Sequence, residues 1–401
     1  MYQAPREVAH YTWPGGEPLQ LDRSGLQYVV PPQGTQPDGR VAGVDLNRGF
    51  PERFVKVAEE RPDDTAALVE AARAARAADP EGRGHPSLHR PDFVLWRGML
   101  RKLLTAPYSS DDDWQFDVRL REGAVHLQEV GARPRRNDAP LADPRDLNRF
   151  QYYGYKFEAL CCVDPGLERD PRALAAREDA VVDTRAQYCV VLGSKLGRHR
   201  VLIGAEVDGA LPPAPGAEPS DKVADLQRRY VELKTTVDWD LLAEHRREQA
   251  RRRYELGRMA ETWAQCYLSG VRTVMMGFRD PGGALSRIQT LPTSSIPEMV
   301  ATRYPDAWKP KVCLQFAKEV LDLLRHHVRE SADGTAWRYR LVKVPGKLGE
   351  LRLYDFEAGG ASGRGSGAPG DDANPDVGTA SVPPATESTA VEPRAIAAND
   401  R

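Results

Sequence analysis

The chain has 401 residues, of which 41% are hydrophobic, so it is long enough to bury a sizeable core. Its 56 basic and 58 acidic residues leave a formal net charge of -2, which argues against a protein that holds nucleic acid by bulk positive charge, so any nucleic-acid site must be a local groove. No stretch approaches the roughly 20 apolar residues of a membrane span, and residues 1–10 lack the pattern of a signal peptide, so we expect a soluble, intracellular protein with no membrane contact.

Helical and hairpin patterns follow one another in the first third of the sequence. An alanine-rich stretch over residues 63–82 predicts a capped helix that stops near its proline. Residues 93–108 are apolar at helical spacing, which predicts a second helix. Polar and apolar residues then alternate through residues 113–130 around the turn Glu122-Gly123, as they do in a β-hairpin.

Strands and helices also alternate in the second part of the sequence. Residues 186–209 have the alternation of two strands joined by a turn, and residues 229–237 predict a short strand. A long arginine-rich helix is expected from about Asp238 to Leu268, followed by a strand over residues 273–280. Strands interleaved with helices predict an α/β fold with a mixed-sheet core.

The composition changes sharply at Gly359. From there to the last residue the chain consists mainly of Gly, Ser, Pro, Ala and Thr, with almost no large apolar side chain. Such a segment buries too little surface to offset its ordering entropy. We therefore expect one folded domain over residues 1–358 and a disordered tail over residues 359–401.

Four charged residues in two apolar stretches give the clearest chemical signal. Glu206 and Asp208 lie two apart in IGAEVDG, and Glu232 and Lys234 lie two apart in YVELKT. Residues two apart on a strand project from the same face, so each pair shares a face, and two adjacent strands would merge the pairs into one site. Carboxylates are costly to bury unless they are paired or bind a metal.

Such a site has a ready use in hydrolysis. Carboxylate oxygens are hard ligands that suit Mg²⁺ or Mn²⁺, and a divalent ion neutralises phosphate charge and lowers the pKa of a water. Lys234 could orient that water or stabilise the developing charge. The arrangement E-x-D followed by E-x-K resembles the core of the PD-(D/E)xK nuclease superfamily. The alternative interpretation is that all four side chains lie on the wet face of an antiparallel sheet.

Further motifs surround these residues in a fixed order. Upstream, GYKFE places Glu158 on a predicted helix after an aromatic cluster, and downstream, WAQ places Gln265 before the next strand. The set WRG, GYKFE, GAEVDG, VELKT, WAQ and GFRD resembles the decapping exoribonuclease family, eukaryotic enzymes that include the fungal nuclear cofactors of a 5′-to-3′ exoribonuclease. The resemblance runs from about Arg23 to Asp280, with a looser match onward to Asp355.

The resemblance implies a set of site residues. It places one or two divalent ions on four carboxylates and one main-chain carbonyl, those of Glu158, Glu206, Asp208, Glu232 and Leu233. With Lys234, the four carboxylates form the implied catalytic set. Substrate contacts are implied for Arg23, Trp96, Arg97, Gly98, Cys189, Glu206, Lys234 and Gln265.

The chemistry of three of these side chains agrees with the implied roles. Arg97 offers a rigid fork of donors that suits a phosphate, and Gln265 can hydrogen-bond a ribose or phosphate oxygen. Cys189 is expected to be a wall of the pocket rather than a nucleophile, because no histidine is placed to activate it. The alternatives are an ion-paired helix residue for Arg97 and a core aromatic for Trp96.

By resemblance we expect two mixed β-sheets flanked by helices, with the active site in a cleft between them. The implied activity is metal-dependent hydrolysis at RNA 5′ ends in RNA quality control. It includes removal of pyrophosphate from 5′-triphosphate RNA, release of an incompletely methylated or NAD cap, and 5′-to-3′ exonucleolytic degradation. The expected compartment is the nucleus, with the cytoplasm as the alternative.

The sequence also allows two other functions. The protein could be a non-catalytic cofactor that stabilises a nuclear 5′-to-3′ exoribonuclease, although intact acidic motifs count against this as its sole role. It could also be a DNA-directed PD-(D/E)xK nuclease, which only the short core motif supports.

Overall fold

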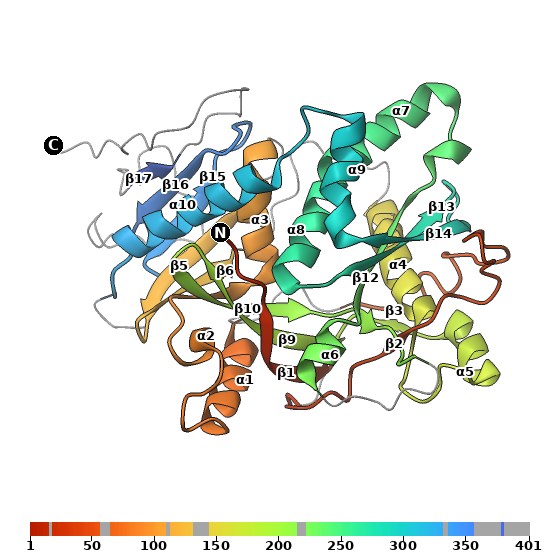
Figure 1. The fold of residues 1–401 in the computed structure, drawn as a ribbon. Helices are drawn as coiled ribbons and strands as arrows, with labels where there is room; N and C mark the ends of the chain where they lie inside the picture. The colour runs from red at the N-terminus through yellow and green to blue at the C-terminus, as the bar shows by residue number, and fades with distance from the viewer. Residues whose placement is uncertain are drawn as a thin grey trace.

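Two mixed β-sheets form the centre of the protein in the computed structural model (Figure 1). The structure describes residues 1–15, 18–56, 65–109, 113–130, 144–214, 222–331, 336–356 and 378–380. A nine-stranded sheet and a six-stranded sheet are each flanked by helices, and a separate pair of strands completes the β-structure of the described residues. The expected α/β class with two mixed sheets is therefore confirmed. No helix in this described part of the chain is both long and apolar enough to cross a membrane.

The large sheet combines antiparallel hairpins with one parallel strand. In spatial order its strands are β1 (Arg6–Pro14), β9 (Ala186–Leu196), β10 (His199–Glu206), β4 (Phe93–Trp96), β6 (Ala124–Glu129), β5 (Gln115–Arg121), β15 (Tyr339–Lys343), β16 (Leu351–Asp355) and β17 (Gly378–Ala380). β4 runs parallel to both of its neighbours, and the other pairs are antiparallel. The two hairpins predicted within residues 113–130 and 186–209 are thus present.

The small sheet contains the second pair of motif strands. Its strands are β14 (Leu285–Pro292), β13 (Thr273–Arg279), β12 (Tyr230–Val237), β11 (Gly209–Ala210), β2 (Tyr28–Val29) and β7 (Cys162–Val163). β12 is parallel to β13, which confirms both strands predicted in this region. The separate pair consists of β3 (Phe54–Val55) and β8 (Val182–Asp183).

Helices cover both faces of the large sheet. Alternate residues of β10 belong to different hydrophobic clusters. Ile203 belongs to the cluster that contains residues of α3 (Arg97–Thr105), and Leu202 belongs to the cluster that contains residues of α1 (Ala66–Ala77). α10 (Pro310–His327) and α8 (Met259–Ser269) join the α3 side, and α2 (Pro86–His89) joins the α1 side. A strand buried on both faces is thereby fixed between two helical layers.

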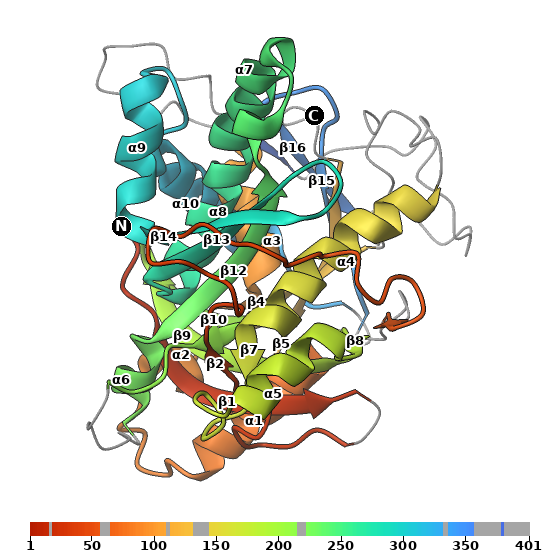
Figure 2. The same cartoon turned by 90° about the vertical axis from the view of Figure 1, so that its right-hand side faces the viewer.

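The small sheet is covered by α4 (Pro144–Cys161), which packs against β12 and is drawn in yellow in Figure 2. The remaining helices and helical turns connect these elements. They are η1 (Ala106–Tyr108), α5 (Pro171–Ala176), η2 (Arg177–Asp179), α6 (Val223–Gln227), η3 (Trp239–Leu241), α7 (Glu244–Arg253), η4 (Tyr254–Arg258), η5 (Thr293–Ser295) and α9 (Ile296–Arg303).

Two predicted helices are corrected by the structure. The helix expected over residues 93–108 begins only at Arg97, because the buried run before it forms the parallel strand β4 between β10 and β6. The arginine-rich helix begins at Glu244 rather than at Asp238, and a π-helical turn at η4 joins α7 to α8. The alanine-rich helix is confirmed as α1, while the proposed capping residues 63 and 64 lie outside the described residues.

One strand falls within the segment expected to be a disordered tail. β17 pairs with the edge strand β16, so this short piece departs from that expectation. The rest of residues 359–401 lies outside the described residues, and the division at residue 358 stays a prediction.

Candidate active site

Glu232 is the centre of a buried polar cluster between the two sheets. It lies on β12 with Lys234, which projects from the same face and forms an ion pair with it, as the spacing predicts. From α3, Arg97 Nη1 donates to Glu232 Oε2 at 3.2 Å, and from α8, Gln265 Nε2 donates to Glu232 Oε1 at 2.5 Å. Three elements that are distant in sequence therefore hold one carboxylate.

Glu206 and Asp208 approach this cluster from the large sheet. Glu206 is the last residue of β10, whereas Asp208 lies between β10 and β11, where the chain passes from the large sheet to the small one. Asp208 Oδ2 accepts a hydrogen bond of 2.7 Å from the main-chain N–H of Leu233. The two pairs do meet, but not on two neighbouring strands of one sheet. Glu206 ends β10 in the large sheet, while Asp208 directly precedes β11, which pairs with β12 in the small sheet.

A cavity of about 510 Å³ opens beside these carboxylates. Glu158 of α4 lines it together with Glu206 and Asp208. Other lining side chains come from the α4–β9 region and from the N-terminal loop, among them Gln27, Tyr155, Cys162, Arg177, Val181 and Tyr188. Its volume lies within the range of small-ligand pockets, about 300–1,000 Å³.

Negative charge is in excess in this cluster. Burial and the neighbouring Asp208 raise the pKa of Glu158 well above its usual range, and burial and Glu232 raise the pKa of Asp208. Burial opposes ionisation of Glu232 too, but Lys234 and Arg97 outweigh it and hold the pKa of Glu232 below its usual value. Two cations thus compensate one carboxylate well and leave the others repelling each other.

The donor set fits a divalent cation. Four carboxylates with two basic side chains leave an uncompensated negative charge that a hard cation would neutralise. As they lie, no three of the described Asp, Glu, His or Cys side chains form a ready set of ligands for one ion. Glu232 is engaged by Arg97, Lys234 and Gln265, so its carboxylate would have to exchange these partners to bind an ion.

The structure places the other predicted substrate contacts around this centre. Arg23 makes an ion pair of 3.3 Å with the buried Glu7, next to the cavity-lining residues Ser24 and Gly25. Cys189 is 1% exposed and pairs in register with Glu206 across β9 and β10. Cys189 does not line the cavity, whereas the preceding residue, Tyr188, does. Tyr188 therefore occupies the wall position expected for Cys189.

The WRG motif marks the start of α3. Trp96 is half-buried and packs against the hydrophobic clusters on both sides of β4, as the core-aromatic alternative expects. Arg97 is 7% exposed and directs its guanidinium at Glu232 and Ser269 rather than into the cavity. Gly98 is exposed, with open space where a Cβ would lie. The direct phosphate contact expected of Arg97 stays a prediction.

Two residues of the site carry no signal in the sequence. Ser269 accepts from Arg97 Nη1 at 3.4 Å and donates to the main-chain carbonyl of Gln265 at 2.9 Å, which ties α3 to α8. Arg177 lines the cavity from η2 and belongs to none of the sequence motifs. A long-range contact of this kind leaves no local pattern.

Comparisons with known proteins identify the family of this chain. The family described as RAI1 like PD-(D/E)XK nuclease matches residues 3–364. The decapping and exoribonuclease protein of Homo sapiens is 33% identical over 330 residues, covering 82% of this chain and 76% of the human protein. The decapping nuclease RAI1 of Emericella nidulans is 30% identical over 369 residues, covering 89% of each chain.

Solved structures have the same fold. A structure of Candida albicans Rai1 in complex with pU5-Mn²⁺ superposes with a TM-score of 0.70 at 21% identity, covering 89% of this chain and 91% of that one. Scheffersomyces stipitis Rai1, in complex with (3'-NADP)+ and calcium ion, gives a TM-score of 0.70 at 22% identity, covering 88% and 90%. The family model, the sequence relatives and the fold agree, and the chain belongs to the RAI1-like family of PD-(D/E)XK nucleases.

Proposed function

We propose that this protein is a divalent-metal-dependent hydrolase that acts on RNA 5′ ends. The observation that carries the proposal is the cavity lined by three carboxylates, those of Glu158, Glu206 and Asp208. The fourth carboxylate, that of Glu232, lies within electrostatic range of Asp208 and pairs with Lys234 and Arg97. Relatives named as decapping nucleases and as decapping and exoribonuclease proteins support the choice of substrate. The products follow from that class: pyrophosphate, a released cap or a terminal nucleotide.

The carboxylates are proposed to hold Mg²⁺ or Mn²⁺, as one or two ions, together with the main-chain carbonyl of Leu233. A divalent ion, when bound, supplies positive charge to the phosphate and makes a water more acidic. The complexes of related proteins with Mn²⁺ and with calcium ion agree with this choice of cofactor.

Side chains of the protein position the attacking water, the phosphate and the Glu232 carboxylate. Lys234 lies against Glu232 at the edge of the cluster, so its ammonium can hold the attacking water or stabilise charge that develops on the phosphate. Burial favours the neutral amine, but Glu232 and Asp208 raise the pKa of Lys234, so it stays positively charged. Arg97 and Gln265 act as positioning residues, because each donates to a Glu232 oxygen and fixes its direction.

Product analysis on RNAs with defined 5′ ends tests the proposal. RNAs that carry a 5′-triphosphate, an NAD cap, an unmethylated cap or a 5′-monophosphate would be incubated with Mn²⁺, with Mg²⁺ or with a chelator. We expect at least one of them to be processed in a metal-dependent way. Processing of single-stranded DNA but of none of the RNAs would favour the DNA-directed nuclease instead.

Two further points belong to the proposal. We place the protein in the nucleus, with the cytoplasm as the alternative, because the resemblance includes nuclear cofactors of a 5′-to-3′ exoribonuclease. Such an exoribonuclease is also the proposed protein partner. Affinity purification from separated nuclear and cytoplasmic fractions of the source cells would test both points, since a partner with no exoribonuclease activity and a purely cytoplasmic signal would reject them.

A further inference from the structure

Arg177 is a buried cation without a carboxylate partner among the described residues. Its residue surface is 6% exposed, and its guanidinium donates only to main-chain carbonyls: Nε to Leu174 at 3.1 Å, Nη1 to Val30 at 2.8 Å and Nη2 to Pro31 at 3.3 Å. Buried arginines are usually paired with an acid, because an uncompensated charge is costly to desolvate. The structure therefore holds a positive charge here that the protein itself does not neutralise.

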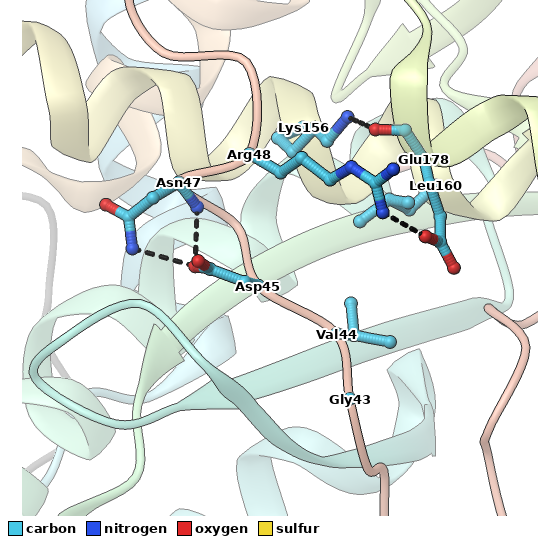
Figure 3. A pocket seen from close by; sticks show the side chains of 8 residues that line it. All are labelled: Gly43, Val44, Asp45, Asn47, Arg48, Lys156, Leu160 and Glu178. Carbon is cyan, nitrogen blue, oxygen red and sulfur yellow. Dashed lines mark hydrogen bonds and ion pairs between the residues drawn. The ribbon is translucent and has the colours of Figure 1, made fainter.

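The acids next to Arg177 in the chain are engaged elsewhere. The Glu178 carboxylate forms an ion pair with Arg48, and the main-chain carbonyl of Glu178 accepts a hydrogen bond of 2.6 Å from the buried Lys156, as Figure 3 shows. Asp179 forms ion pairs with Arg48 at 2.7 Å and with Arg53 at 3.1 Å. These contacts hold the side of η2 that carries Glu178 and Asp179. Arg177 is the charged side chain that the turn presents on its other side.

That other side is the active-site cavity. Arg177 lines it together with the carboxylates of Glu158, Glu206 and Asp208. The cavity thus has both a fixed cation and an acidic cluster in its lining. A guanidinium has five N–H donors, and the three carbonyl bonds leave two of them for a ligand.

We propose that Arg177 is a substrate-binding residue that contacts a phosphate of the RNA 5′ end other than the phosphate being hydrolysed. The inference rests on the proposed function, because an RNA 5′ end supplies a second anion next to the scissile bond. The fork geometry of a guanidinium suits a phosphate, and the carbonyl bonds hold the fork in place before the substrate arrives. Arg177 would then select ends that carry more than one phosphate.

The test compares Arg177→Gln and Arg177→Lys with the wild type on a short 5′-triphosphate RNA. Loss of a charge-assisted contact should raise KM by about tenfold or more in Arg177→Gln, with kcat within about threefold, and Arg177→Lys should restore part of the affinity. Inhibition by inorganic pyrophosphate should weaken in parallel. The control is Arg172→Gln, an exposed arginine of the neighbouring α5, which should change none of these values.

A purely structural role for Arg177 predicts another pattern. In that case Arg177→Gln would lower the melting temperature or kcat while KM and the pyrophosphate inhibition constant stay unchanged, and the inference would be overturned. If Arg177→Gln does not fold, Arg177→Lys decides through the same two constants. If the wild type hydrolyses no RNA 5′ end, the proposed function fails, and calorimetric binding of pyrophosphate decides the inference: wild-type binding that is lost in the variants supports it, and equal binding or none rejects it.

Discussion

Glu206 and Asp208, the proposed metal ligands, lie in a cluster of mutually repelling carboxylates. Replacing either with Ala should reduce hydrolysis by roughly a hundredfold or more, because loss of a residue that merely orients a metal ligand already costs about 10–100-fold. The fold should persist, since burial and neighbouring acids already disfavour ionised Asp208. Product formation and melting temperature would be measured for both variants and for the double variant. Full activity in the double variant would remove these residues from the mechanism.

Replacing Arg97 with lysine tests whether the shape of the guanidinium matters in addition to its positive charge. Lysine keeps the charge but cannot reproduce the contacts to both Glu232 and Ser269, so Arg97→Lys should lower kcat/KM by about tenfold. Arg101→Lys, one turn later on α3, is the matched control, because Arg101 pairs with the partly exposed Glu261 and should tolerate the exchange. Equal kinetics for Arg97→Lys and the wild type would show that Arg97 does not position Glu232.

The sequence predicted the residues of the cluster better than their placement. The shared face of Glu232 and Lys234 follows from the period of a strand and is present in β12. Glu206 and Asp208 also line one cavity, but not because they share a strand: β10 ends at Glu206, and Asp208 lies where the chain passes to the other sheet. Arg177 has no local pattern at all, since its role depends on Val30 and Pro31, almost 150 positions away.

Helix α4 transmits the position of the small sheet to Glu158. Phe157, the preceding residue, is fully buried, and a Cβ added at Gly277 of β13 would lie 2.7 Å from its ring. Gly277→Ala should therefore push α4 away from the sheet, with a loss of about 1–3 kcal/mol in the free energy of unfolding. It should also lower activity by displacing Glu158.

The matched control for this element is Gly257→Ala. Gly257 lies in the exposed part of η4, and an added Cβ there has no neighbour within 4 Å. Stability and activity should stay close to wild type or rise slightly, because alanine favours helix more than glycine does. Denaturant unfolding and RNA hydrolysis would be measured for both variants. Two variants with the same stability would disprove the close packing of α4 on β13.

The boundary between β4 and α3 cannot be read from the sequence pattern. Phe93, Val94 and Leu95 are buried on both faces of the large sheet, so they show no alternation and their run merges with the apolar stripe of the helix. A short apolar run cannot be assigned to strand or helix by periodicity alone. Its parallel pairing with β10 and β6, a long-range interaction, decides the matter.

The described part of the tail, β17, belongs to the large sheet and not to the candidate active site. β17 extends the edge of the large sheet beyond β16, at the opposite end of the strand order from β9 and β10, which carry Cys189 and Glu206. Removal of residues 359–401 should leave kcat and KM unchanged and reduce stability by at most about 1 kcal/mol, the value of a few cross-strand pairs. Hydrolysis of a short RNA by the truncated protein checks this. Loss of activity with an intact melting transition would assign the tail a part in catalysis.

The proposed function requires the 5′ end of an RNA to enter the cavity that Glu158, Glu206 and Asp208 line. The most direct measurement compares a linear RNA with a circular single-stranded RNA of the same sequence, with Mn²⁺ or Mg²⁺ and at high enzyme concentration. The linear RNA should be processed in at least one of its 5′-triphosphate, NAD-capped or 5′-monophosphate forms, while the circle resists because it has no end to enter the cavity. Efficient, metal-dependent cutting of the circle would contradict the account and identify a general nuclease.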